Sequence, residues 1–192
     1  MFLMSQKTAV KPCSLVRYQT VDSTNQEAIR LFSSGAKRPP FVVVSETQTA
    51  GRGQRGRSWY SDSSGGLYYS LCVTPRVYDP EKLAYYHEHV ADLISDVIQT
   101  ISGVRPDFKA PNDLYIGVKK LCGTLFQSQI QMGETVPDCM VIGVGINVNQ
   151  DNFPESISDI ATSLYQVTGK LYDLSEFVTL LTKELRYVFE RD

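Results

Sequence analysis

Apolar side chains change their spacing several times along the chain, and these changes predict an ordered series of helices and strands. Residues 22–34 carry the signals of a helix, because Asp22 or Ser23 can cap it, Thr24 with Glu27 fits a capping box, and Gly35 can end it. The β-branched run 41–47 then predicts a buried strand, and residues 67–74 predict a second one.

The longest predicted helix opens at Asp79 and Pro80 and stops at Gly103. Its apolar positions keep the spacing of one helical face. They are Leu83, Tyr86, Val90, Ile94, Val97 and Ile101.

The middle of the chain has the period of strands, joined by turns that include one around Gly133. The predicted strands are 108–110, 114–116, 119–130 and 139–149, and the predicted helices after them are 159–168 and 174–190. Because the central strands follow one another as hairpins, the fold class is α+β, a mixed sheet with helices packed on one face.

Composition excludes several classes of protein. The 192 residues are 42% hydrophobic and 21% charged, which favours a single domain over residues 1–192. The net charge of −2 gives no basic field for nucleic acid, and no apolar run is long enough to cross a membrane. The start of the chain lacks the pattern of a signal peptide, and the four cysteines lack CxxC spacing. Reduced thiols in a cytoplasmic protein are therefore expected.

A glycine-rich loop carries the first candidate chemistry. Arg52, Arg55 and Arg57 lie among glycines directly before Trp59. Ordering glycine costs much backbone entropy, and clustered guanidinium groups repel one another unless an anion joins them. We therefore expect the loop from Gly51 to about Ser64 to become ordered on an anionic ligand.

Several further motifs accompany this loop. They are DSTN at 22–25, QTAGRGQRGRSW at 48–59, KAPNDLY at 109–115, KKLCGTL at 119–125 and GVGINVN at 143–149. In this order they resemble the signature blocks of biotin protein ligases, from about Val21 to the C-terminus. The resemblance implies the fold shared with class II aminoacyl-tRNA synthetases. It also implies a reaction in which ATP activates biotin to its adenylate and a lysine of an acceptor protein then takes the biotin.

Lys120 is the expected catalytic cation, because joining a carboxylate to the α-phosphate of ATP brings two anions together. In a regular strand Lys120 shares a face with Cys122 and Thr124, while Leu121, Gly123 and Leu125 share the other. If the leucines face the core, Lys120 faces the ligand. The alternative is a solvated surface lysine. Cys122 is interpreted as a small buried thiol rather than a nucleophile.

The resemblance assigns roles to the remaining residues. It implies Lys120, Arg52 and Asp113 as catalytic, with Asp113 orienting the incoming amine or a Mg²⁺ ion. It implies a biotin site made of Ser23, Thr24, Gln48, Gly51, Arg52, Lys120, Gly123, Leu125 and Gly143. It implies a nucleotide site made of Arg55, Arg57, Trp59, Asn112, Lys120 and Asn147. Helix capping is an equally good account of Ser23 and Thr24, and a plain turn accounts for Asn112 and Asp113.

The expected ligands and partners follow from the same resemblance. They are biotin, Mg·ATP and the biotin carboxyl carrier protein of acetyl-CoA carboxylase, without DNA or a membrane, and with a homodimer left open. Few residues precede DSTN and the sequence stops after the last helix, so neither a DNA-binding winged helix nor a C-terminal β-barrel is expected. Gln54 and Ala110 stand where the family usually has arginine and tryptophan. Ligation of lipoate or another acyl acid, and biotin binding without catalysis, are the alternatives.

Overall fold

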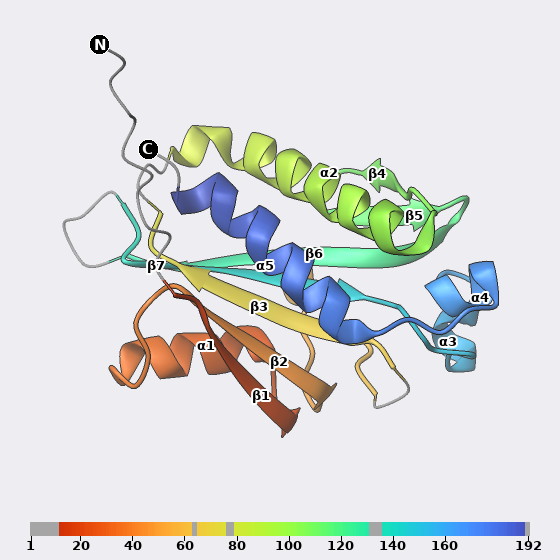
Figure 1. The fold of residues 1–192 in the computed structure, drawn as a ribbon, viewed down its shortest axis with the longest axis horizontal. Coiled ribbons are helices and arrows are strands. Elements are labelled where there is room, and N and C mark those ends of the chain that lie inside the picture. The colour runs from red at the N-terminus through yellow and green to blue at the C-terminus, as the bar shows by residue number, and fades with distance from the viewer. Residues whose placement is uncertain (1–11, 63–64, 76–78, 131–135, 191–192) are drawn as a thin grey trace, which may run out of the picture.

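A computed structural model describes residues 12–62, 65–75, 79–130 and 136–190 of the chain. Its strands form one seven-stranded sheet in the order β1-β2-β3-β7-β6-β5-β4 (Figure 1). The strands are β1 Ser14–Val21, β2 Phe41–Gln48, β3 Leu67–Val73, β4 Asp107–Lys109, β5 Asp113–Ile116, β6 Lys119–Gln129 and β7 Cys139–Ile146. The pair β1–β2 is parallel and the other pairs are antiparallel. The predicted mixed sheet is confirmed.

Five α-helices accompany the sheet in the described part of the chain. They are α1 Thr24–Ser33, α2 Leu83–Ser102, α3 Glu155–Ser158, α4 Leu164–Thr168 and α5 Leu174–Glu190. Short 3₁₀ turns occur at Gln54–Gly56 and Pro80–Lys82. Among the described residues, no helix is both long and apolar enough to cross a membrane.

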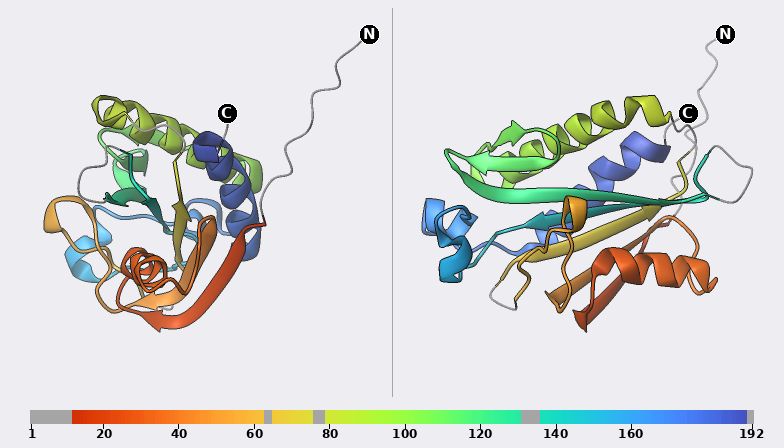
Figure 2. Two further views of the ribbon diagram at one scale, coloured as in Figure 1. Left: turned by 90° about the vertical axis from the view of Figure 1, so that its left-hand side faces the viewer. Right: turned by 180° about the vertical axis from the view of Figure 1, so that it is seen from behind.

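The helices cover both faces of the sheet, so the expectation of one covered face is wrong. Helices α2 and α5 lie side by side on one face, and α1 lies on the opposite face, as the end-on view in Figure 2 shows. The cause is visible in β2. Val42 and Val44 enter the core beneath α2 and α5, whereas Phe41 and Val43 pack against α1. The consecutive apolar residues 41–44 point to both faces of the sheet, so this part of β2 needs cover on both sides.

Helix α2 follows its predicted pattern. Val90, Ile94 and Val97 are buried against the sheet, and each fully buried aliphatic side chain of this size contributes about 1.5–3 kcal/mol relative to exposure. Gly103 ends the helix in the left-handed conformation with φ 77°. The side chain of Leu83 and the turn around Gly133 lie outside the described residues.

Some local predictions are wrong. The capping box at α1 does not form, because Glu27 accepts a hydrogen bond from the Tyr18 hydroxyl at 2.7 Å and pairs with Arg30 instead. Strand β1 was not predicted, since its side chains are mostly exposed and lack a clear alternation. The predicted helix 159–168 is also wrong in its first half, where Ala161 forms a parallel bridge with Lys120.

Candidate functional site

A cavity of about 710 Å³ lies on the face of the sheet that carries α1. Its lining comes from the start of α1, the end of β2, the arginine loop, strands β5, β6 and β7, and segment 153–161. Every site residue predicted from the sequence lines this cavity except Arg55. Arg55 instead lines a second cavity of about 350 Å³, together with Gln54 and His87.

Thr24 and Gln48 form a polar group at the end of the cavity beside α1. The Thr24 backbone N–H and its hydroxyl both donate to Gln48 Oε1, at 2.8 and 3.1 Å. Gln48 Nε2 donates to Ser61 Oγ at 2.9 Å. Ser23 occupies the N-cap position of α1 without a side-chain cap bond. Capping therefore does not explain Ser23 and Thr24, and the group offers both donors and acceptors to a ligand.

Asn25 belongs to the same wall and was not singled out from the sequence. Its Oδ1 accepts a hydrogen bond from Ser70 Oγ at 2.6 Å, and its Nδ2 donates to the Leu125 carbonyl at 3.1 Å and to Gln127. Gly143 lies directly beneath it, where an added Cβ would be 2.3 Å from Asn25 Oδ1. The only sequence signal for Asn25 was its place inside DSTN.

A β-bulge at Leu121 decides which way Lys120 points. Tyr115 of β5 pairs with Lys120 while the adjacent Leu114 pairs with Cys122, which leaves Leu121 as the extra residue. Leu121 and Cys122 consequently both enter the core, so the predicted alternation is wrong. The bulge returns Lys120 to the cavity side, where its Nζ would be 3.2 Å from a Cβ at Gly123. Lys120 faces the cavity as expected, although for a different reason.

The Lys120 ammonium forms an ion pair inside the cavity. Its Nζ lies 2.7 Å from Asp113 Oδ1, and the two side chains are 25% and 12% exposed. The same Nζ lies 5.1 Å from the centre of the Trp59 ring, within the range of a cation–π contact. Lys119, in contrast, turns away and donates to the Ser158 carbonyl at 2.8 Å. Of the two adjacent lysines, only Lys120 lines the cavity.

Segment 160–162 fixes the backbone of Lys120. The Lys120 N–H donates to the Ile160 carbonyl at 2.8 Å, and the Thr162 N–H donates to the Lys120 carbonyl at 2.9 Å. Asn147 supports this segment by donating from Nδ2 to the Thr162 carbonyl at 3.0 Å, and its backbone N–H donates to the Leu121 carbonyl. Much of the Asn147 side chain is thus engaged in holding the chain.

Trp59 lies across a floor of glycines. A Cβ at Gly145 would be 2.6 Å from Trp59 Cε2, and one at Gly123 would be 3.0 Å from Trp59 Cζ3. The Trp59 Nε1 atom is buried and has no hydrogen-bond partner among the described residues. The two glycines therefore allow the indole to reach the sheet and form a wall of the cavity.

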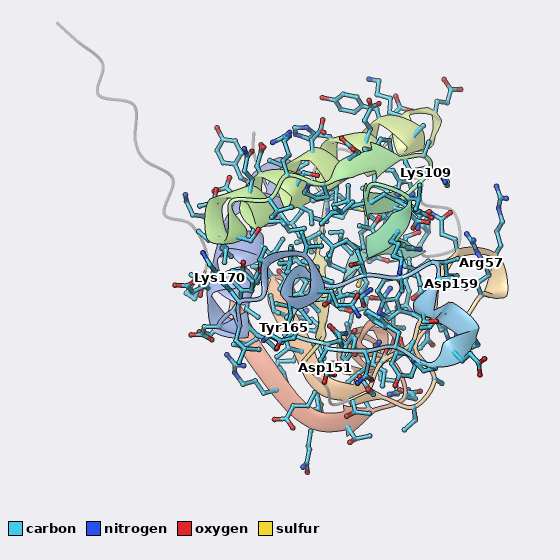
Figure 3. The ribbon with its side chains drawn as sticks, turned by 90° about the vertical axis from the view of Figure 1, so that its right-hand side faces the viewer. Arg57, Lys109, Asp151, Asp159, Tyr165 and Lys170 are labelled. Carbon is cyan, nitrogen blue, oxygen red and sulfur yellow. The ribbon has the colours of Figure 1, made fainter. Side chains whose placement is uncertain are left out.

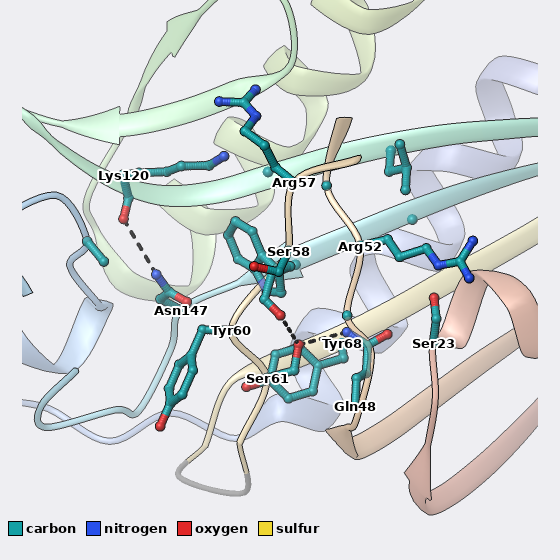
Figure 4. Close-up of a pocket in the computed structure, with 18 of the residues that line it drawn as sticks. Ser23, Gln48, Arg52, Arg57, Ser58, Tyr60, Ser61, Tyr68, Lys120 and Asn147 are labelled. Carbon is teal, nitrogen blue, oxygen red and sulfur yellow. Dashed lines mark hydrogen bonds between the residues drawn. The ribbon is translucent and has the colours of Figure 1, made fainter. Parts of the chain in front are cut away.

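The arginine loop has a defined backbone. The Trp59 N–H donates to the Gly51 carbonyl at 2.9 Å, and the Gly53 N–H donates to the Arg57 carbonyl at 2.7 Å. Figure 4 shows Arg52 extending on the side of the cavity where Ser23 lies, with Arg57 and Lys120 on the other side. Arg57 is exposed at the rim (Figure 3).

The guanidinium groups of this loop form no ion pair within the described part of the chain. In the described part of the chain, no carboxylate forms an ion pair with Arg52, Arg55 or Arg57. Backbone hydrogen bonds shape the loop, while its positive charges stay available to an anion. Ordering of the loop by a ligand stays a prediction.

Asn112 presents an unpaired acceptor beside the ion pair. Its Nδ2 donates to the Thr124 carbonyl at 2.6 Å, whereas its Oδ1 is buried and has no hydrogen-bond partner among the described residues. Buried polar atoms are seldom left unpaired, so this oxygen is a candidate for contact with a ligand. Cys122, by contrast, lies fully in the core, and burial raises the pKa of its thiol, which disfavours a nucleophilic thiolate.

The chain is similar to known proteins over most of its length. Residues 16–147 match the model of the Biotin/lipoate A/B protein ligase family. The chain is 35% identical to the bifunctional ligase/repressor BirA of Bacillus spizizenii, over 94% of this chain and 56% of that protein. It is 32% identical to the biotin–[acetyl-CoA-carboxylase] ligase of Mycobacterium tuberculosis, over 85% of this chain and 59% of that one. A solved biotin protein ligase from Aquifex aeolicus, in complex with biotin and ATP, superposes with a TM-score of 0.73 at 32% identity, covering 93% of this chain and 73% of that one.

The fold is thus an α+β domain of the kind found in these relatives. The chain belongs to the Biotin/lipoate A/B protein ligase family. It spans somewhat more than half the length of the curated relatives just described.

Proposed function

We propose that this protein is an ATP-dependent biotin–protein ligase, acting through one catalytic domain over residues 1–192. The observation that carries the proposal is a single cavity with a donor–acceptor group at Thr24 and Gln48 and a lysine ammonium at Lys120. A ureido ring needs donors and acceptors together, and an adenylation reaction needs a cation near two anions. The relatives named as biotin ligases support the same choice.

In the first step, the biotin carboxylate attacks the α-phosphate of Mg·ATP and pyrophosphate leaves. Lys120 supplies positive charge where the two anions meet, and it leaves its ion pair with Asp113 to do so. Arg52 lines the cavity without a carboxylate partner among the described residues, so its guanidinium fork is available to the carboxylate or phosphate. Arg57 at the rim adds charge for the phosphates.

A Mg²⁺ ion fits the residues near Lys120. Mg²⁺ is commonly held by one or two carboxylates together with substrate phosphates, and it neutralises charge on those phosphates. Asp113 provides one carboxylate, and the unpaired Asn112 Oδ1 is a second oxygen nearby in sequence and in the cavity lining. No group of three or more metal-binding side chains occurs among the described residues, which is consistent with an ion that arrives on ATP.

In the second step, the ε-amine of an acceptor lysine attacks the adenylate and releases AMP. Once Lys120 has turned to the phosphate, Asp113 is free to accept a proton or a hydrogen bond from that amine. The proposed acceptor is the biotin carboxyl carrier protein of acetyl-CoA carboxylase. A cytoplasmic location, a possible homodimer and the absence of DNA binding are parts of the same proposal.

A direct assay tests the proposed function. The protein is incubated with ATP labelled at the α-phosphate and either biotin or lipoate, and the adenylate is separated by chromatography. Labelled biotinyl-AMP is expected, followed by transfer of biotin to a carrier protein. Lipoyl-AMP in its place would establish the acyl-acid alternative. Biotin binding by calorimetry without any adenylate would establish a binding protein without catalysis.

A further inference from the structure

Two cysteines from neighbouring strands meet in the core beneath α1. Cys72 of β3 and Cys139 of β7 are both wholly buried, and their Sγ atoms are 3.0 Å apart. They lie 67 residues apart in the chain. Both sulfurs belong to the apolar cluster that also contains Phe41, Val43 and Ala28. They are free thiols in this structure.

The strand register explains their contact. Cys72 pairs with Val141, and Cys139 lies two residues from Val141 on the same face of β7. The two cysteines are therefore diagonal neighbours on one face of an antiparallel pair, with their side chains turned towards each other so that the sulfurs meet. To form a disulfide bond of roughly 2.05 Å the sulfurs must approach by about 1 Å, and strands β3 and β7 must adjust to bring the two Cα atoms within bonding range.

We propose that Cys72 and Cys139 are an oxidation site, at which a peroxide converts the two thiols into an internal disulfide. One thiol reacts with hydrogen peroxide to give a sulfenic acid and water. The second thiol then attacks that sulfur and releases a second water molecule. Two thiols and one peroxide thus give one disulfide and two waters. Because Cys139 and burial both raise the pKa of Cys72, the first step is slow and needs local opening of the core.

The position of the pair determines what the disulfide does. Ser70 lies two residues before Cys72 and pairs with Gly143, so the floor beneath Asn25 occupies the adjoining part of the same two strands. The crosslink joins β3 to β7 beside this floor, and neither cysteine lines the cavity. Oxidation is therefore expected to stabilise the fold while ligand binding is retained.

Peptide mapping of the wild-type protein provides the primary test. The native protein is treated with hydrogen peroxide, remaining thiols are alkylated in denaturant, and peptides are analysed without reduction. A peptide pair linked through Cys72 and Cys139, reversed by dithiothreitol, is the expected product. Two alkylated cysteines, oxidation to sulfinic or sulfonic acid, or a disulfide to Cys13 or Cys122 would each overturn the proposal.

Thermal unfolding supplies the second readout, in a Cys13→Ser background that removes the partly exposed thiol. Closing a long loop should raise the melting temperature of the oxidised protein by roughly 5–15 °C. The variant with Cys139→Ala added should show no change on oxidation. A lower melting temperature for the disulfide form would show that the two cysteines cannot be joined without distortion.

Discussion

Replacement of Lys120 by alanine is the sharpest test of the site, because an adjacent lysine provides a matched control. Lys120 Nζ lies in the cavity, 2.7 Å from Asp113 Oδ1. Lys119 precedes it in the same strand but contacts the Ser158 carbonyl. The two substitutions remove the same charge and the same number of atoms. Only Lys120→Ala removes them from the cavity.

The expected loss has two parts. Removing one donor aimed at developing charge commonly costs about 100- to 1,000-fold in rate. The substitution also leaves the carboxylate of Asp113 without its cation beside anionic substrates. At a separation of about 5 Å and an effective dielectric constant near 20, that repulsion is about 3 kcal/mol, or roughly a further 100-fold. Adenylate formation should therefore fall by about 10⁴-fold or more.

Single-turnover formation of biotinyl-AMP under saturating biotin and ATP measures this loss, and thermal unfolding reports whether each variant folds. Lys119→Ala should keep the rate within a few-fold of the wild type, because neither Lys119 nor its partner Ser158 lines the cavity. A Lys120→Ala variant with a nearly normal rate, or equal losses in both variants, would refute the assignment of Lys120 as the catalytic cation.

Three further predictions follow from the described contacts. Backbone amides of residues 51–62 should gain hydrogen-exchange protection when biotin and ATP are added, and unchanged protection would mean that the loop does not bind them. Gly143→Ala should displace the Asn25 amide, which makes three hydrogen bonds, and lower the free energy of unfolding in urea by about 1.5–4 kcal/mol. Gly53→Ala is the control and should have little effect, because its added Cβ would lie 3.4 Å from the Arg57 carbonyl oxygen, an ordinary contact. The hydrogen bond from Arg30 lowers the pKa of Asp22 to about 2, so the ionised Asp22 stabilises the fold above about pH 4, and this stabilisation is lost towards pH 2. Asp22→Asn should therefore flatten this part of the profile of melting temperature against pH. An unchanged profile would contradict the reasoning.

The regular parts of the fold were predictable because their hydrophobic period is clear. Helix α2 and strands β2 and β3 lie close to their predicted bounds, since each has a long run of apolar positions at one spacing. The exposed edge strand β1 carries no such run. The unbroken apolar run at the start of β2 indicates cover on both faces of the sheet, whereas the hairpin order of the central strands does not fix how many faces are covered.

The site was predictable as a set of residues, but its geometry was not. The motifs contain about two thirds of the residues that line the cavity, because they combine glycine, arginine and lysine in an unusual way. A bulge such as that at Leu121 depends on pairing with a distant strand, so no local pattern marks it. The wall made by residues 153–161 was unpredictable for the same reason, because its position depends on hydrogen bonds to Lys120, which is distant in sequence. Asn25 was hidden for another reason: its role exists only where Ser70 and Gly143 meet it.

The two backbone hydrogen bonds at Lys120 also constrain how the cavity can adapt to what it holds. Segment 153–161 forms one wall, and its last residues are bonded to the strand that carries the ammonium group. This wall and Lys120 therefore form a single mechanical unit. A substrate analogue too bulky for this wall would displace Lys120 from its position as it binds. A poor fit far from the reacting atoms would therefore lower the rate of adenylate formation rather than the binding affinity.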